Sequence, residues 1–426
     1  MRDYLLALTI ALSLPVIMRH PFAGILVWIW LSVNAPSHQT YGFARPLAFN
    51  AIVAVVTMFS WMISREKKSW PNDSISFALA CLTGWMTINM AMAVDPSWSW
   101  PYWSLTAKTM VLIFMVMVMA TSKARLHAVV WMVVISVGYY GVKGSIFTIL
   151  TGGGSIVYGP ENTMIGDNNH LALATVMILP LIHYLRIETS NKWIRHGLGL
   201  VFFIQFFSIL GSYSRGGAIA LGVMLLMFWR ESQHKILYMV LGLAALGVVL
   251  TFMPDTFWSR MNTLRDTSTD ASFQGRVSAW WVAFYFAIDH FPFGAGFYAP
   301  QLESVFNAYF PTEAAHAAHS IYFQVLGEQG VIGLLVYLVM CVSGLLGCRD
   351  VIRRARTVSG LDWIIVLAKM IRVSLIAFFV GGAALSLAYY DAYLLLYSLI
   401  VALRTMARKA QREQAAAMPK GIAASV

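Results

Sequence analysis

Apolar stretches of near-membrane length recur from one end of this 426-residue chain to the other. We place them near residues 3–18, 22–35, 46–64, 74–93, 103–120, 127–149, 170–185, 197–213, 216–229, 236–253, 319–347, 373–389 and 391–403. Together with 59% hydrophobic and only 12% charged residues, such stretches are typical of a polytopic membrane protein. The sequence therefore predicts an all-α bundle of membrane-spanning helices surrounded by membrane lipid.

The lysine and arginine residues predict how this bundle is oriented. Of the 30 such residues, 21 lie in the segments 65–68, 123–125, 186–195, 230–235 and 349–372 and in the tail from residue 404. The positive-inside rule places these segments in the cytoplasm, together with the C-terminus. The first two apolar stretches are each shorter than the roughly 20 residues of a full span, so we expect about 12 spans, or 13 if both cross separately.

Residues 254–318 form a connection too long to be a simple turn between spans. This segment is aromatic throughout and has helix-compatible stretches after Gly275 and near Leu302, which indicates short helices lying on the outer leaflet. We therefore expect membrane helices within residues 1–253, a helical cap on the exterior side at 254–318 and further membrane helices at 319–403. The Ala-rich, charged tail at 404–426 is predicted to be cytoplasmic and disordered.

Several functional classes do not fit this sequence. The formal charge of +11 arises from short clusters between apolar stretches rather than from a soluble basic face, which argues against nucleic-acid binding. Cys81, Cys341 and Cys348 lie in or beside apolar stretches without metal-ligand spacing, so we interpret them as buried thiols. The chain has no Walker A motif, GxSxG elbow, Rossmann fingerprint or Asp-x-Asp pair, so we expect chemistry without ATP, a cofactor or a divalent metal.

Two arginines on the cation-poor side of the membrane are candidate anion ligands. Arg215 is followed by Gly216 and Gly217 at the start of an apolar helix, where a guanidinium and free backbone amides can bind a phosphate group. Arg276, in the long loop, would grip a diphosphate from the other side. The competing interpretations are an arginine that snorkels to the interface and an ordinary loop cation. Weaker candidates on the same side are Lys143, Arg260 and Arg265.

His319 is the candidate general base. An imidazole near its ordinary pKa accepts a proton at neutral pH and can activate a sugar hydroxyl. His316 lies three residues earlier, where the two imidazoles could share a helix face, but no nearby carboxylate completes a zinc site. Glu328 is expected about 13 Å deeper along the same helix, paired with a buried donor, and Gly330 is expected to permit close helix packing.

Polar residues also begin the apolar stretch near residue 170. Asp167, Asn168, Asn169 and His170 either satisfy the amides at the end of a helix or contact the hydroxyls of a sugar. The sequence leaves both interpretations open.

The order of these motifs resembles the O-antigen ligase family. Ser-Arg-Gly stands at an exterior span end, Gly-Arg lies in the long outer loop, and His-Ser is followed by Glu-x-Gly, with the likeness densest from about residue 162 to residue 333. The segment 166–170 is similar to a subgroup associated with exosortase systems. The resemblance implies an inverting glycosyltransferase of the GT-C class in the bacterial inner membrane, which moves a glycan from undecaprenyl diphosphate to lipid A-core at a periplasmic active site.

The resemblance also implies roles for individual residues. Arg215 and Arg276 would hold the diphosphate, and His319 would act on the acceptor hydroxyl without a metal ion. Ser320 stands where many relatives have asparagine, which leaves only a secondary contact in doubt.

Three alternatives remain open. A protein O-oligosaccharyltransferase and an O-antigen polymerase share these motifs closely and differ in the acceptor. A transporter or flippase of lipid-linked sugars would perform no bond chemistry, but the unusual polar residues gather on the exterior side, which favours a one-sided active site. A structural scaffold would not explain interfacial arginines on the cation-poor face.

Overall fold

The computed structural model describes residues 1–66, 68–231 and 271–417, together with seven further positions between residues 232 and 270. Every regular element in these residues is a helix. Seven of these helices are long and apolar enough to cross a membrane, and two more are shorter apolar helices. The prediction of an all-α polytopic membrane protein is therefore confirmed, whereas the number of spans stays a prediction.

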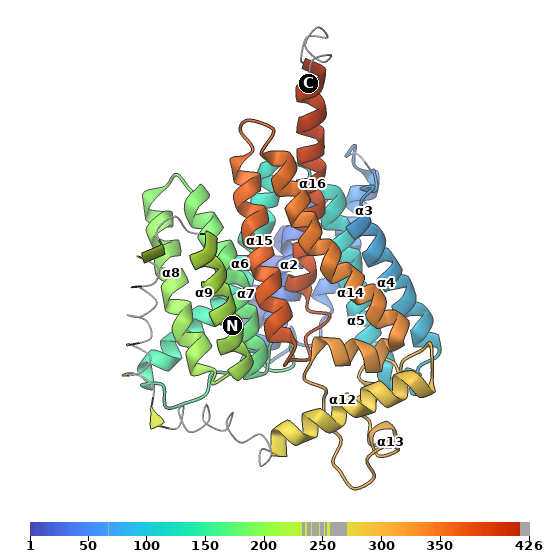
Figure 1. Cartoon of the computed structure of the whole chain (residues 1–426). Coiled ribbons are helices and arrows are strands. Elements are labelled where there is room, and N and C mark those ends of the chain that lie inside the picture. Colours follow the sequence, from blue (N-terminus) through green and yellow to red (C-terminus); the bar gives the residue numbers. More distant parts are fainter. Residues whose placement is uncertain are drawn as a thin grey trace.

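The main helices run up and down beside one another in a bundle (Figure 1). In chain order they are α1 (Arg2–Arg19), α2 (Pro21–Val33), α3 (Phe49–Ile63), α4 (Ser74–Ala91), α5 (Pro96–Met119), α6 (Lys123–Leu150), α7 (Asn168–Glu188), α8 (Lys192–Gly211), α9 (Arg215–Glu231), α14 (Ile321–Ala355), α15 (Asp362–Gly382) and α16 (Asp391–Ala417). A 3₁₀ turn, η1 (Pro36–Gln39), follows α2. The predicted apolar stretch at 236–253 lies outside the described residues, apart from isolated positions.

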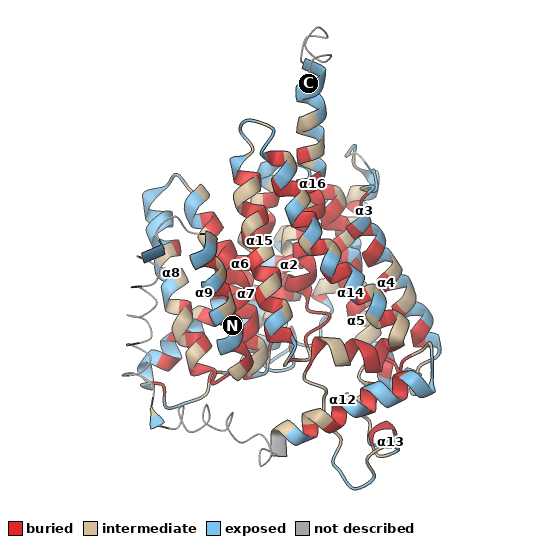
Figure 2. Ribbon diagram, in the orientation of Figure 1, coloured by how far each residue is buried: buried red, intermediate tan, exposed pale blue. Residues whose placement is uncertain are grey.

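Helix α7 lies at the centre of the bundle. It packs against α6, α8, α9 and α15, and its residues from Leu171 to Ile182 are buried without interruption. A helix that is apolar on all sides is stable only when other helices surround it. Figure 2 shows the same distribution, with buried residues concentrated in the middle of the bundle and exposed ones on its outer helices.

Two predicted boundaries near the C-terminus are wrong. Residues 349–372 were expected to be a connection, but α14 continues to Ala355 and α15 already begins at Asp362. The predicted disordered tail is helical as far as Ala417. Arg404 explains this continuation, because it is buried and forms an ion pair with Asp73 at 2.8 Å that ties α16 to the start of α4. Hydropathy does not detect helix ends that are held by charge pairs.

The helices predicted after Gly275 and near Leu302 are present. They are α12 (Ala271–Asp289), η3 (Ala299–Gln301) and α13 (Glu303–Phe306), and α12 lies across the end of the bundle opposite to the emerging end of α16 (Figure 1). One face of α12 buries Val282 and Phe286 against α13. Its other face exposes Trp281 and Tyr285, an aromatic pattern suited to a membrane interface.

Helix α14 is broken at Gly330, which has φ 72° and ψ −174°. The break frees backbone groups that the neighbouring segment uses: the Ala295 amide donates to the Gly327 carbonyl at 2.8 Å, and the Gly296 amide donates to the Glu328 carbonyl at 3.0 Å. A Cβ at residue 330 would overlap the Pro292 carbonyl oxygen. Gly330 therefore permits close packing, as predicted. The segment that packs against it is the chain at Pro292, not another membrane helix, and α14 is broken at this glycine.

We expect Gly330→Ala to destabilise the protein by about 2–4 kcal/mol, because alanine is disfavoured at positive φ and its methyl group would overlap the chain at Pro292. Thermal unfolding of the purified protein measures the effect. Gly222→Ala is the matched control, since a Cβ there would meet no atom within 4 Å. Equal melting temperatures for the two variants would contradict the packing seen at the break.

Candidate active site

The turn before α9 fixes the position of Arg215. Tyr213 has φ 56°, in the left-handed region, and its hydroxyl donates to the Gly153 carbonyl. The Ser214 side chain accepts a hydrogen bond from the Gly217 amide at 3.0 Å and so caps the helix. Arg215 follows as the first residue of α9 and is half-buried.

The two glycines after Arg215 differ in their surroundings. A Cβ at residue 217 would lie 2.6 Å from the Ala172 Cβ, so Gly217 allows α9 to pack closely against α7. Its amide is already bound by Ser214. The expectation of free backbone amides at this helix end is therefore wrong for Gly217. Gly216 has looser surroundings, because the atom nearest to an added Cβ there would be the Gly381 carbonyl oxygen at 3.6 Å.

His319 precedes α14 instead of forming its first turn. Its φ is 43°, and the helix begins at Ile321 after Ser320. Residues 314–319 have no regular structure, so the expected i, i+3 helix face shared by His316 and His319 does not exist. Because His319 lies before the helix, the expected placement of Glu328 along a common helix axis is also wrong.

The imidazole of His319 is partly buried, and its Nδ1 has no hydrogen-bond partner among the described residues. The pKa of His319 is lowered to about 4, chiefly by burial and also by the nearby Arg276 and His170. The expectation of an imidazole near its ordinary pKa is therefore wrong: the ring is neutral at pH 7 and is a weaker base than an exposed histidine. A neutral imidazole with an unused nitrogen can accept a proton or a hydrogen bond.

Helix α12 brings Arg276 beside His319. Trp280 of this helix stacks on Phe323, with ring centroids 5.1 Å apart, and its Nε1 donates to the Ala318 carbonyl at 2.6 Å. These contacts hold α12 against the start of α14. Gly275 leaves room for His316, whose Cδ2 would lie 2.6 Å from an added Cβ. In the Gly-Arg motif, Gly275 thus lies against His316, and Arg276 lies near the candidate base His319.

The polar residues at the start of α7 divide into two groups. Asp167 caps the helix by accepting from the Asn169 amide at 2.8 Å, and Asn168 is buried and donates to the Ser212 carbonyl at 2.6 Å. Burial raises the pKa of Asp167, but His170 and Asn169 lower it by more, so its carboxyl stays ionised. The helix-capping interpretation therefore describes Asp167, Asn168 and Asn169, whereas His170 lies within electrostatic range of His319.

The first turn of α7 connects the two candidate regions. Asn168 and Ala172 contact the turn and the first residues of α9, which carry Arg215. Asp167 and His170 interact electrostatically with His319. The structure thus brings Arg276, His170 and His319 together and places Arg215 on a helix end adjoining the same turn.

The remaining candidates lie elsewhere. Glu328 is buried, and the Gln324 side-chain amide donates to its carboxylate at 3.4 Å, so the expected buried donor is present. Lys143 lines a separate apolar pocket with Trp131 and Val201. Arg260 and Arg265 lie outside the described residues. Within the described parts of the chain, no three His, Cys, Asp or Glu side chains gather closely enough to hold a metal ion.

Comparisons with known families match two long segments of this chain. Residues 200–338 match the family model described as O-antigen ligase, and residues 1–190 match a family of unknown function. No curated protein matches the chain. The first segment contains Arg215, Arg276 and His319, and the second contains the start of α7.

Proposed function

Because the chain carries a domain of the O-antigen ligase family at residues 200–338, we propose that it is a membrane glycosyltransferase that moves a glycan from undecaprenyl diphosphate to lipid A-core. The reaction takes place on the periplasmic side of the bacterial inner membrane, with α12 and α13 as the periplasmic cap and the C-terminus in the cytoplasm. The fold is of the GT-C type with about 12 spans.

The setting of His319 is the observation that carries this proposal. A neutral imidazole with an unpartnered nitrogen lies beside a guanidinium, which suits a base that works next to an anionic substrate. The acceptor hydroxyl attacks the anomeric carbon of the glycan as its proton passes to His319. The bond from that carbon to the diphosphate breaks, the electron pair leaves with the diphosphate, and the configuration inverts.

Arg215 and Arg276 stabilise the departing diphosphate. Negative charge increases on the leaving oxygen as the bond breaks, so fixed guanidinium groups bind the transition state more strongly than the ground state. Arg276 also favours the neutral form of His319, which keeps the base ready before the acceptor arrives. His170 and His316 supply further polar contacts beside the acceptor.

The acceptor is tested by supplying purified protein with undecaprenyl-diphosphate-linked glycan in three conditions. With lipid A-core, we expect a glycan on the lipid. A product on an added pilin-type protein would identify a protein O-oligosaccharyltransferase, and longer lipid-linked chains without any acceptor would identify a polymerase. Movement of the donor across a vesicle membrane without any new glycosidic bond would identify a transporter and overturn the proposal.

We expect transfer to be independent of a divalent metal, because two arginines perform the charge neutralisation that a metal ion performs in many other transferases. Initial rates measured with excess EDTA and with added Mg²⁺ should agree within about twofold. Loss of activity in EDTA that Mg²⁺ restores would contradict this part of the mechanism and leave the choice of acceptor untouched.

A further inference from the structure

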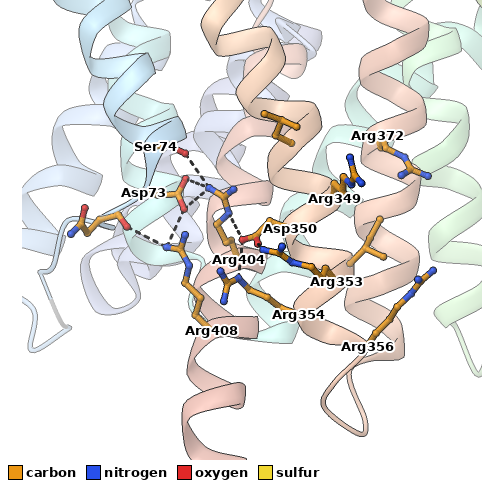
Figure 3. A pocket seen from close by; sticks show the side chains of 13 residues that line it. Asp73, Ser74, Arg349, Asp350, Arg353, Arg354, Arg356, Arg372, Arg404 and Arg408 are labelled. Carbon is orange, nitrogen blue, oxygen red and sulfur yellow. Dashed lines mark hydrogen bonds and ion pairs between the residues drawn. The ribbon is translucent and has the colours of Figure 1, made fainter. Parts of the chain in front are cut away.

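A pocket rich in arginine lies at the end of the bundle opposite to the candidate active site. Its volume is about 940 Å³, and it lies between the start of α4, the end of α14, α15 and the second half of α16 (Figure 3). The charged residues that line it are Asp73, Arg349, Asp350, Arg353, Arg354, Arg356, Arg372, Arg404 and Arg408. Nothing in the proposed transfer reaction uses them.

The two carboxylates order part of this pocket. Asp73 binds Arg404 at 2.8 Å and Arg408 at 3.3 Å. Asp350 binds Arg353 at 2.6 Å and Arg354 at 2.8 Å, and it also contacts the buried Arg404 at 3.1 Å. These ion pairs hold the guanidinium groups in fixed positions, which reduces the conformational entropy that a ligand would otherwise have to restrict.

The pocket nevertheless has a large excess of positive charge. Seven arginines and two aspartates line it, so five positive charges are not balanced by carboxylates. Arg349 and Arg356 form no ion pair within the described part of the chain. Guanidinium groups held this close together repel one another, and an anion with several oxygens relieves that repulsion.

One face of α14 connects the pocket to the lipid-facing surface. Leu335, Val339, Val342 and Leu346 are exposed at a spacing of three or four residues, as expected of a face turned toward acyl chains. Arg349, Arg353 and Arg356 continue the same face at the same spacing. The helix thus changes from apolar to cationic along a single line, and Leu346 itself lines the pocket.

We propose that this pocket binds the phosphate headgroup of an anionic membrane phospholipid, whose acyl chains lie along the exposed face of α14. Arginine forms bidentate hydrogen bonds with phosphate oxygens, and basic pockets between membrane helices are a recurrent form of lipid site. The volume lies within the roughly 300–1,000 Å³ of small-molecule sites and exceeds what one phosphate ion requires. The adjoining apolar face favours a lipid over a free phosphate.

The test uses the full chain, purified in a neutral detergent and titrated with phosphatidylglycerol, cardiolipin or phosphatidylcholine. The melting temperature reports binding, because a ligand of the folded state stabilises it. We expect the two anionic lipids to raise the melting temperature and phosphatidylcholine to have little effect. Inorganic phosphate and diphosphate test whether the pocket binds a soluble phosphate instead of a lipid. If either one stabilised the protein as much as phosphatidylglycerol does at the same concentration, the assignment to a lipid would be overturned.

Arg349→Gln/Arg356→Gln is the decisive variant, because neither residue takes part in the ion pairs that order the pocket. We expect its apparent affinity for phosphatidylglycerol to fall about tenfold or more. Arg65→Gln/Arg230→Gln is the matched control, since it removes the same charge from exposed residues outside the pocket. Equal losses in both variants would show general attraction to an anionic surface and overturn the proposal. The assay involves no glycan, so its outcome is independent of the transfer reaction.

Discussion

Replacing His319 with alanine should lower the rate of glycan transfer by about 10²–10⁴-fold, the usual contribution of a positioned general base. The acceptor hydroxyl would then have to lose its proton to water while it attacks. His319 also adopts a positive φ, a backbone conformation that is costly for a residue with a side chain and is often found at functional sites. Transfer is measured as initial rate with lipid-linked glycan and lipid A-core.

The matched control for this variant is His290→Ala. His290 also belongs to the cap, where it stacks on Phe286, and it is not among the charged neighbours of His319. Its variant should keep nearly full activity. If His319→Ala retained more than about a tenth of the wild-type rate in a protein with an unchanged melting temperature, another group would have to be the base.

The pH dependence gives this histidine a second readout. Its folded pKa of about 4 lies below the ordinary value of 6.5, so the folded state favours the neutral ring. The corresponding contribution to stability is present above pH 6.5 and is lost as the pH falls toward 4, because the unfolded chain binds the proton first. Activity should therefore have no acidic limb near pH 6.5, and such a limb would show that the ring is not shielded as the structure indicates.

The helices and the candidate residues were predictable because both depend on local sequence. Apolar length identifies a helix that can cross a bilayer, and an arginine such as Arg215 on a cation-poor side is visible without any tertiary contact. The subgroup suggested by residues 166–170 stays a prediction. So does the division of the chain into two membrane parts, a cap and a tail.

Other features depend on contacts between distant residues and could not be derived from the sequence. At the break near Gly330, the amides of Ala295 and Gly296 pair with the opened backbone of α14, and the chain at Pro292 packs against the glycine. The helical tail exists because Arg404 reaches Asp73, more than 300 positions earlier in the chain. Trp280 is one of the aromatic residues of the 254–318 segment, but its hydrogen bond to Ala318, which orders the chain next to His319, follows only from the fold.

The site also draws on the segment that matches a family of unknown function. Asp167 and His170 belong to residues 1–190, and both act electrostatically on His319, which belongs to the O-antigen ligase match. Asn168 ties the same turn to the chain just before Arg215. The two matched segments therefore meet around the candidate base, and residues 1–190 contribute to its electrostatic environment.

Replacing Arg276 with glutamine should lower the rate of transfer by about 10²–10³-fold, the loss that follows removal of one group that stabilises transition-state charge. The variant should also raise the pKa of His319, because one of the nearby positive charges that lower it is removed. An acidic limb would then appear at a higher pH than in the wild-type protein. A purely structural role for Arg276 would change stability without moving that limb.

Arg276→Lys and Arg45→Gln are the controls for this prediction. Lysine keeps the charge but lacks the bidentate geometry, so Arg276→Lys should recover part of the rate and restore the low pKa of His319. Arg45 is an exposed cation that has no part in the proposed site, so its variant should retain full activity. Arg215→Gln should match Arg276→Gln in its loss of rate, because both guanidinium groups are proposed to neutralise the departing diphosphate. Full activity in both arginine variants would mean that the diphosphate is held by other groups.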